Sequence, residues 1–310
     1  MEKNLLFIVN PASGKGQISQ NLMNITDIFI KAGYRVRLHT TQDHLDAKNL
    51  VTSEGENYDL IVAAGGDGTL SEVIGGVLRL ENRVKIGYIP CGSTNDFANS
   101  LQLPKQPVRA ARVITDGVPF RCDTGSFNDR NFNYVAAFGA FTDVSYETPQ
   151  ENKNMFGHLA YIIEGMSRLP KLPSYEMKIT CDGETISGNF ILGMIMNSNF
   201  VGGIKGDRLV KADLSDGLFE LLLFETPSNI LDLQGIITSL IRGESEGKGY
   251  FLKKVKEVTV ETDDEIKWTL DGEFGGNDKK AKIEVIEHAV DIMVAKDNKA
   301  ISAADSDDKE

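Results

Sequence analysis

The chain has 310 residues, 41% of them hydrophobic and 25% charged, and this length exceeds what one hydrophobic core usually supports, so we expect two domains. The net charge of −12 argues against general nucleic-acid binding, which needs a basic surface. The cysteines Cys91, Cys122 and Cys181 lack metal-ligand and redox spacing, and no stretch reaches the roughly 18 apolar residues of a membrane span. We therefore expect a cytoplasmic protein without a zinc site.

The first part of the chain alternates between strand patterns and helix patterns. The apolar run 5–9 ends at Asn-Pro and is typical of a buried strand, whereas Ile18, Leu22, Ile25 and Phe29 recur at helical spacing. A β-α-β-α-β-α-β series predicts a parallel sheet with helices on both faces, which binds ligands beyond the carboxyl ends of its strands. The further predicted strands are 34–40, 58–64 and 84–90, and the helices are 17–32, 44–56 and 69–80.

After about residue 125 strand patterns dominate, and Asp182-Gly183 is a strong hairpin signal between two of them. Helical patterns at 155–169 and 229–242 are consistent with core packing or with a lipid surface. We expect an α/β domain over 1–125, joined in one interpretation by residues 290–310, and an antiparallel, β-rich, sandwich-like domain over 126–289. Its predicted strands are 131–138, 175–181, 188–197, 217–224, 254–262, 265–270, 281–287 and 289–295.

Three glycine-bearing turns follow three predicted strands, at 10–16, 65–69 and 90–96. Parallel pairing would bring these strand ends to one edge of the sheet. Neither the Walker pattern nor the dinucleotide pattern G-x-G-x-x-G is present. The turns therefore predict a phosphate-binding site of another kind.

Asp67 stands in the second turn, where a bare carboxylate would repel a phosphate group. Thr69 and Glu72 have the Thr-x-x-Glu spacing of a capping box, which predicts that a helix begins at Thr69 with Asp67 near its positive end. Alternatively, backbone N–H groups at the helix start bind an anion, and magnesium lies between Asp67 and the phosphates.

The segments GGDGTLSE (65–72) and PCGSTNDFA (90–98) resemble the catalytic domain of diacylglycerol kinases, and the likeness extends to about residue 295. It is closest to the soluble bacterial members. The resemblance implies an ATP- and magnesium-dependent lipid kinase that phosphorylates diacylglycerol to phosphatidic acid, with an α/β domain similar to those of phosphofructokinases and NAD kinases. Because the family is broad, other acceptors are alternatives. They are sphingosine, ceramide, a phosphatidylglycerol-like lipid or, in a distant branch, NAD.

The resemblance also implies specific binding residues. A second magnesium site would use the Asp216 side chain with main-chain oxygens of Asp213 and Leu218, although an ordinary turn explains this segment equally. Family members more often carry threonine at the position of Ser93. The implied ATP contacts are Asn10, Pro11, Ala12, Ser13, Gly14, Thr41, Gly66, Asp67, Gly68, Thr69, Leu70, Ser71, Glu72 and Ser93.

The segment WTLDGEF (268–274) carries the candidate proton acceptors Asp271 and Glu273. If the strand continues through both, their carboxylates point to the same face; a glycine turn with solvated charges is the alternative. The resemblance favours Glu273 as the acceptor, with Asp271 close behind and Asp67 positioning the catalytic magnesium.

Lipid phosphorylation further implies a membrane-derived substrate and peripheral contact with the inner membrane surface. Exposed edges in the β-rich half would allow a homodimer.

Overall fold

The computed structural model describes residues 2–139, 174–198, 213–229 and 249–298, with a few isolated residues between these ranges. The chain divides into two compact units, Met1–Asp123 with Glu287–Glu310, and Thr124–Ile286. It passes from one unit to the other within two strands, β5 (Val118–Phe127) and β15 (Glu273–Val294).

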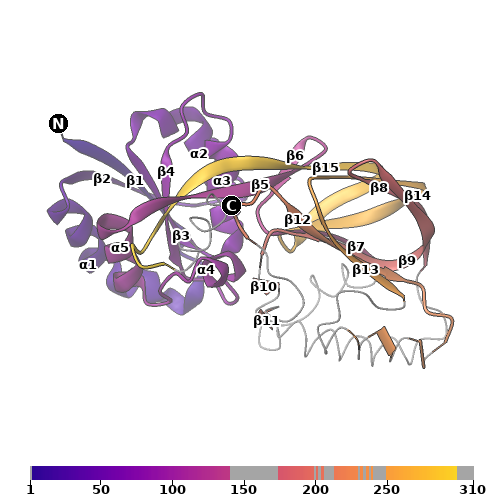
Figure 1. The fold of residues 1–310 in the computed structure, drawn as a ribbon. Coiled ribbons are helices and arrows are strands. Elements are labelled where there is room, and N and C mark those ends of the chain that lie inside the picture. The colour runs from indigo at the N-terminus through magenta and orange to yellow at the C-terminus, as the bar shows by residue number, and fades with distance from the viewer. Residues whose placement is uncertain are drawn as a thin grey trace. The chain divides into compact units, whose positions relative to one another are not determined.

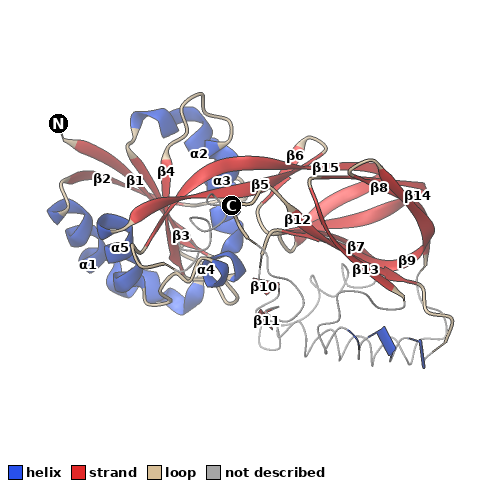
Figure 2. Cartoon of the chain, viewed as in Figure 1, coloured by secondary structure: helices blue, strands red, loops and turns tan. Residues whose placement is uncertain are grey.

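The first unit contains a sheet with helices packed around it (Figure 2). Its strands follow the order β4-β3-β1-β2, and all three pairs are parallel, as the alternation of strand and helix patterns predicts. The strands are β1 (Lys3–Val9), β2 (Tyr34–Thr40), β3 (Leu60–Gly65) and β4 (Lys85–Pro90). The helices are α1 (Gln17–Lys31), α2 (Asp46–Glu54), α3 (Asp67–Val77), α4 (Asp96–Ser100) and α5 (Pro107–Asp116).

Burial explains why these segments adopt their structures. The central strands β1 and β3 are covered on both faces, so their apolar runs are continuous. The helix α1 buries Ile18, Ile25 and Phe29, and the Phe29 ring meets that of Phe7 edge to face at 5.4 Å. The sequence patterns missed α4, α5 and β5, because α4 is a single turn and the charged residues of α5 resembled a solvated run.

The second unit is built mainly of antiparallel strands (Figure 1). Its strands β7 and β8 each pair with both β9 and β14, at different stretches of those two strands, so the strands of this unit form one continuous network of pairing. The strands are β6 (Arg130–Phe132), β7 (Val135–Gly139), β8 (Tyr175–Cys181), β9 (Glu184–Met196), β12 (Phe219–Glu225), β13 (Tyr250–Val255) and β14 (Glu257–Leu270); β10 (Phe200–Val201) and β11 (Ile204–Lys205) form a separate pair.

Several predicted strand limits were wrong. The strand predicted at 131–138 is interrupted at Asn133 and Tyr134, between β6 and β7. Conversely, 254–262 and 265–270 are largely one strand, β14, because a register shift between Glu261 and Ile266 accommodates the charged residues there. The helix predicted at 155–169, and most of that at 229–242, lie outside the described residues.

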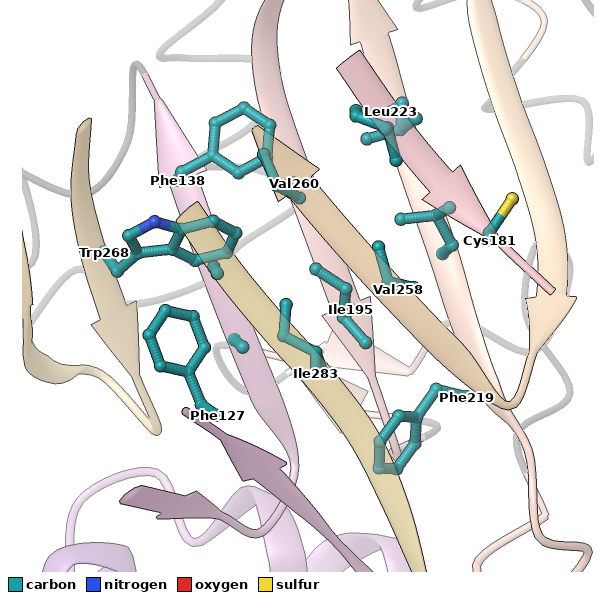
Figure 3. Close-up of a cluster of buried hydrophobic side chains, with 14 of the residues drawn as sticks. Phe127, Phe138, Cys181, Ile195, Phe219, Leu223, Val258, Val260, Trp268 and Ile283 are labelled. Carbon is teal, nitrogen blue, oxygen red and sulfur yellow. The ribbon is translucent and has the colours of Figure 1, made fainter. Parts of the chain in front are cut away.

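The core of the second unit centres on Trp268 (Figure 3). Its indole is fully buried and meets the rings of Phe127 and Phe138 at centroid distances of 4.8 and 5.0 Å. Edge-to-face pairs of this kind add stability beyond the burial of their area.

In the part of the chain that the structure describes, no helix has the length and apolar character needed to cross a membrane.

We expect Phe138→Ala to lower the free energy of unfolding of the second unit by about 3–5 kcal/mol, because it leaves a cavity against Trp268. The chain has 1 tryptophan, so its emission during urea titration reports this unit. Leu231→Ala, at a side chain that is 76% exposed, should change the value by less than about 0.5 kcal/mol. A similar small loss for Phe138→Ala would contradict the prediction.

Candidate functional site

The three glycine-bearing turns lie side by side at the carboxyl ends of β1, β3 and β4. Asn10, after β1, donates its backbone N–H to Ala64 at 2.9 Å and its side-chain N–H to Thr69 Oγ1 at 3.1 Å. Cys91, after β4, donates its N–H to the carbonyl of Gly65 at 2.7 Å. The second turn is therefore bonded to both of the others.

Glycines allow these turns to approach each other closely. A Cβ atom on Gly92 would lie 2.6 Å from Gly66 Cα, which real structures do not tolerate. Gly14 has a left-handed backbone with φ of +66°, and a Cβ there would overlap the carbonyl oxygen of Cys91. Any larger residue at Gly14 or Gly92 would move one turn away from the next.

The capping-box prediction for Thr69 and Glu72 was wrong. The helix α3 begins at Asp67, with Gly66 as its N-cap, so Thr69 lies within its first turn. The Glu72 carboxylate instead accepts the N–H groups of Leu45 at 2.9 Å and Ala47 at 3.1 Å, which caps the start of α2. Glu72 thus joins α3 to α2. The spacing of residues within one helix does not predict a contact with another helix.

Asp67 joins the second turn to the third. Its carboxylate oxygens accept the N–H groups of Asp96 at 3.1 Å and Phe97 at 3.4 Å, at the start of α4. Burial raises the pKa of Asp67, and these hydrogen bonds oppose that rise. The backbone N–H groups of Asn95 and of Asp67 itself also form hydrogen bonds with this carboxylate. A divalent cation beside the buried carboxylate would favour its ionised form.

Sequence reasoning missed Asn95 and Tyr88, which hold the third turn in shape. Asn95 Oδ1 accepts the N–H of Gly92 at 2.9 Å and lies 3.3 Å from the Tyr88 hydroxyl, and Asn95 Nδ2 donates to the Gly92 carbonyl at 2.7 Å. Asn95 has a left-handed backbone, which asparagine tolerates better than most residues. Burial raises the pKa of the Tyr88 hydroxyl well above 10, so it stays a neutral donor.

The remaining predicted ATP contacts have different surroundings. Thr41 lies at the same edge, since its N–H donates to the carbonyl of Val9 at 2.9 Å. The Leu70 side chain is buried in the unit, so only its main chain is available to a ligand.

The thiol of Cys91, in the third turn, is also buried. Burial raises its pKa to about 11, so it is not a nucleophile at neutral pH.

In the second unit, Asp271 and Gly272 form the two-residue loop of a hairpin. Both have left-handed backbones, with φ of 51° and 84°, and Leu270 pairs with Glu273 on either side. This is the geometry that Asp-Gly favours in tight hairpins. Of the two interpretations of this segment, the structure therefore shows the glycine turn, because the chain reverses between Asp271 and Glu273, although Asp271 is buried and not solvated.

The two acidic residues of this hairpin have opposite surroundings. Asp271 is 8% exposed, and its carboxylate accepts four hydrogen bonds from the backbone and side chain of Asn133 and the N–H groups of Tyr134 and Val135. A carboxylate offers about four lone-pair sites, so these bonds fill Asp271. The Glu273 carboxylate is exposed and forms no hydrogen bond or ion pair with the residues that the structure describes. Only Glu273 can receive a proton without breaking an existing contact.

The predicted second magnesium site lies in the loop before β12. Asp213 accepts hydrogen bonds from Ser215, and Asp216 accepts the N–H of Leu218 at 3.1 Å. The other oxygen of Asp216 lies 2.5 Å from the ammonium nitrogen of Lys254. An ammonium group therefore takes the place beside Asp216 that a cation would need.

Lys254 Nζ also lies 3.8 Å from Glu220, whose pKa burial raises to about 8. Across the described ranges, no group of three or more His, Cys, Asp or Glu side chains is arranged to hold a metal ion. The expected site uses one side chain and two main-chain oxygens, so it stays a prediction, and we assign this loop no step in the chemistry.

Comparison with known proteins identifies the family of this chain. The model of the diacylglycerol kinase catalytic domain matches residues 4–127. A diacylglycerol kinase of Staphylococcus aureus (strain MRSA252) is 35% identical over 300 residues, covering 96% of this chain and 94% of the relative. One of Bacillus subtilis (strain 168) is 34% identical over 278 residues, covering 88% and 91%.

Among solved structures, a protein from Bacillus anthracis str. Sterne that is assigned to the diacylglycerol kinases matches with a TM-score of 0.81 and 26% identity. The match covers 94% of this chain and 95% of that chain. The described elements thus occur in a protein of known structure, and the relatives match over nearly their whole length. The chain belongs to the diacylglycerol kinase family and is a kinase of that family.

Proposed function

We propose that the protein transfers the γ-phosphoryl group of ATP to the hydroxyl group of diacylglycerol, giving phosphatidic acid, with magnesium as the required cation. The observation that carries this proposal is the exposed Glu273 carboxylate, which begins β15 beside a turn whose own carboxylate is fully engaged. The names of the relatives support diacylglycerol as the acceptor.

The first unit binds the nucleotide in this proposal. The N-terminus of α3 lies at the edge where the three turns meet, and the first N–H groups of a helix attract phosphate groups. The predicted contacts Asn10–Gly14, Thr41 and Ser93 belong to that edge or to the segments that reach it. Magnesium bound with the nucleotide neutralises phosphate charge, and Asp67 would hold it while anchoring α4.

The second unit supplies the proton acceptor. The hydroxyl oxygen of the lipid forms a bond to the γ-phosphorus, the bond between that phosphorus and the β-phosphate oxygen breaks, and ADP leaves. The hydroxyl proton passes to Glu273, which is free to accept it. General base catalysis of this kind contributes roughly 10²–10⁴-fold to a rate.

The substrate implies a place of action. Diacylglycerol is a membrane lipid, so we propose a cytoplasmic enzyme that contacts the inner membrane surface transiently. A homodimer is compatible with the exposed strand edges.

Radiolabelled ATP offered with diacylglycerol, ceramide, sphingosine, phosphatidylglycerol or NAD tests the acceptor. Labelled phosphatidic acid is the expected product, and label in NAD alone would overturn the proposal.

We expect Gly14→Ala to weaken ATP binding by about tenfold or more, because a methyl group there pushes the first turn away from Cys91. Fluorescent-nucleotide titration of the folded variant measures the change. Gly16→Ala is the matched control, since Gly16 also has a left-handed backbone but has nothing within 4 Å of its missing Cβ. Equal losses in the two variants would mean that backbone strain, and not the packing of the turns, is responsible.

We expect Glu273→Gln to lower kcat by about 10²–10⁴-fold with little change in KM for ATP, because glutamine cannot accept the proton. Steady-state phosphorylation of diacylglycerol in mixed micelles measures both constants. Glu284→Gln, at a partly exposed carboxylate of the same strand, should leave kcat unchanged. Normal turnover by Glu273→Gln would rule out Glu273 as the proton acceptor.

A further inference from the structure

We propose that Tyr134 and Asp271 are positioning residues for Glu273, and that the Tyr134 hydroxyl sets the orientation of the peptide between Asp271 and Gly272, in the loop that leads into Glu273. The inference rests on the proposed role of Glu273 as proton acceptor. Neither residue would touch the substrate in this proposal; both would act through the hairpin loop.

The anchor begins where the chain leaves β6. Asn133 and Tyr134 lie between β6 and β7, so their N–H groups are not part of a strand ladder. Together with Val135 they direct three consecutive backbone N–H groups, and the side chain of Asn133, at the carboxylate of Asp271, with distances of 2.8–3.2 Å. Buried N–H groups need an acceptor, and this carboxylate supplies it.

The backbone of Asp271 is held as firmly as its side chain. Its N–H donates to the Val135 carbonyl at 2.8 Å, and its carbonyl accepts the Tyr134 hydroxyl at 2.9 Å. That carbonyl belongs to the peptide between Asp271 and Gly272, the last residue before Glu273. The Tyr134 hydroxyl therefore limits rotation of one of the two peptide units that join Asp271 to Glu273.

A second hairpin in the same unit shows what the turn requires by itself. The tripeptide Asp-Gly-Glu also occurs at 182–184, where Asp182 and Gly183 have φ of 47° and 84°. Asp182 is exposed, and Glu184 forms an ion pair with Lys253 at 2.6 Å. The same three residues thus make the same kind of turn without burial, without a tyrosine hydroxyl and with the glutamate engaged elsewhere.

The hydrogen bonds to Asp271 also leave one buried atom of Asn133 without a partner. Asn133 is 3% exposed, and its Oδ1 has no hydrogen-bond partner while its Nδ2 holds Asp271. A buried acceptor without a partner is unfavourable. The Asp182 carboxylate also accepts backbone N–H groups, from Lys256 at 3.0 Å and Glu257 at 3.0 Å. What distinguishes Asp271 is therefore its burial and the Tyr134 hydroxyl on its carbonyl, and we attribute these two features to the placement of the loop.

The decisive experiment is a double-mutant cycle between Tyr134→Phe and Glu273→Gln. Phenylalanine fills the same buried volume, so thermal unfolding should change little. We expect Tyr134→Phe to lower kcat by about 10- to 100-fold with KM for ATP unchanged, since small displacements of a reacting group have effects of this size. If Tyr134 acts through Glu273, adding Tyr134→Phe to Glu273→Gln lowers the residual rate no further.

Asp271→Asn gives an independent test, because Asn-Gly forms the same turn but removes one of the two acceptor oxygens. We expect it to lower kcat and to be non-additive with Glu273→Gln. Asp182→Asn, in the other Asp-Gly-Glu hairpin, and Tyr250→Phe, at a buried tyrosine of β13, are the matched controls and should leave kcat unchanged.

Three outcomes would overturn the inference. Normal kcat in a folded Tyr134→Phe protein would mean that the hydroxyl does not position the base. Equal fractional losses in the wild-type and Glu273→Gln backgrounds would mean a general structural role. Full activity of Glu273→Gln itself would refute the proposed proton acceptor, and this failure is distinguishable because it appears without any change at Tyr134.

Discussion

Backbone N–H groups that no helix or strand satisfies must find acceptors. In this chain, carboxylates supply such acceptors at the starts of two helices and before β7. Asp67 accepts the first N–H groups of α4, Glu72 those of α2, and Asp271 those of residues 133–135. Each carboxylate connects two segments that are distant in sequence. Removing the Asp271 carboxylate would leave the three buried N–H groups of residues 133–135 unpaired at once.

This use of carboxylates separates residues that look equivalent in the sequence. Asp271 and Glu273 are two positions apart, yet one is buried and saturated with hydrogen bonds while the other is exposed and free. Asp67 is buried as well, and its carboxylate anchors the start of α4 while burial raises its pKa. The chemical role of an acidic residue thus depends on how many donors already surround it.

The glycines have a complementary role at the edge of the first unit. Gly66 and Gly92 bring two backbones into contact, and Gly14 brings a third against Cys91. Carboxylates then hold these segments by hydrogen bonds that need the close approach, such as those from Asp67 to α4. Packing and hydrogen bonding are therefore interdependent at this edge of the sheet.

The sequence by itself determined the alternation of strands and helices from β1 to β4, the strand-rich second half, and the three turns at one sheet edge. Periodicity and turn residues are local properties, so they carried over to the structure. The interruption at 133–134, the start of α3 at Asp67 and the partners of Glu72 and Asp271 were decided only by tertiary structure. Each depends on donors contributed by residues 25 to 138 positions away, and no local pattern records such a distance.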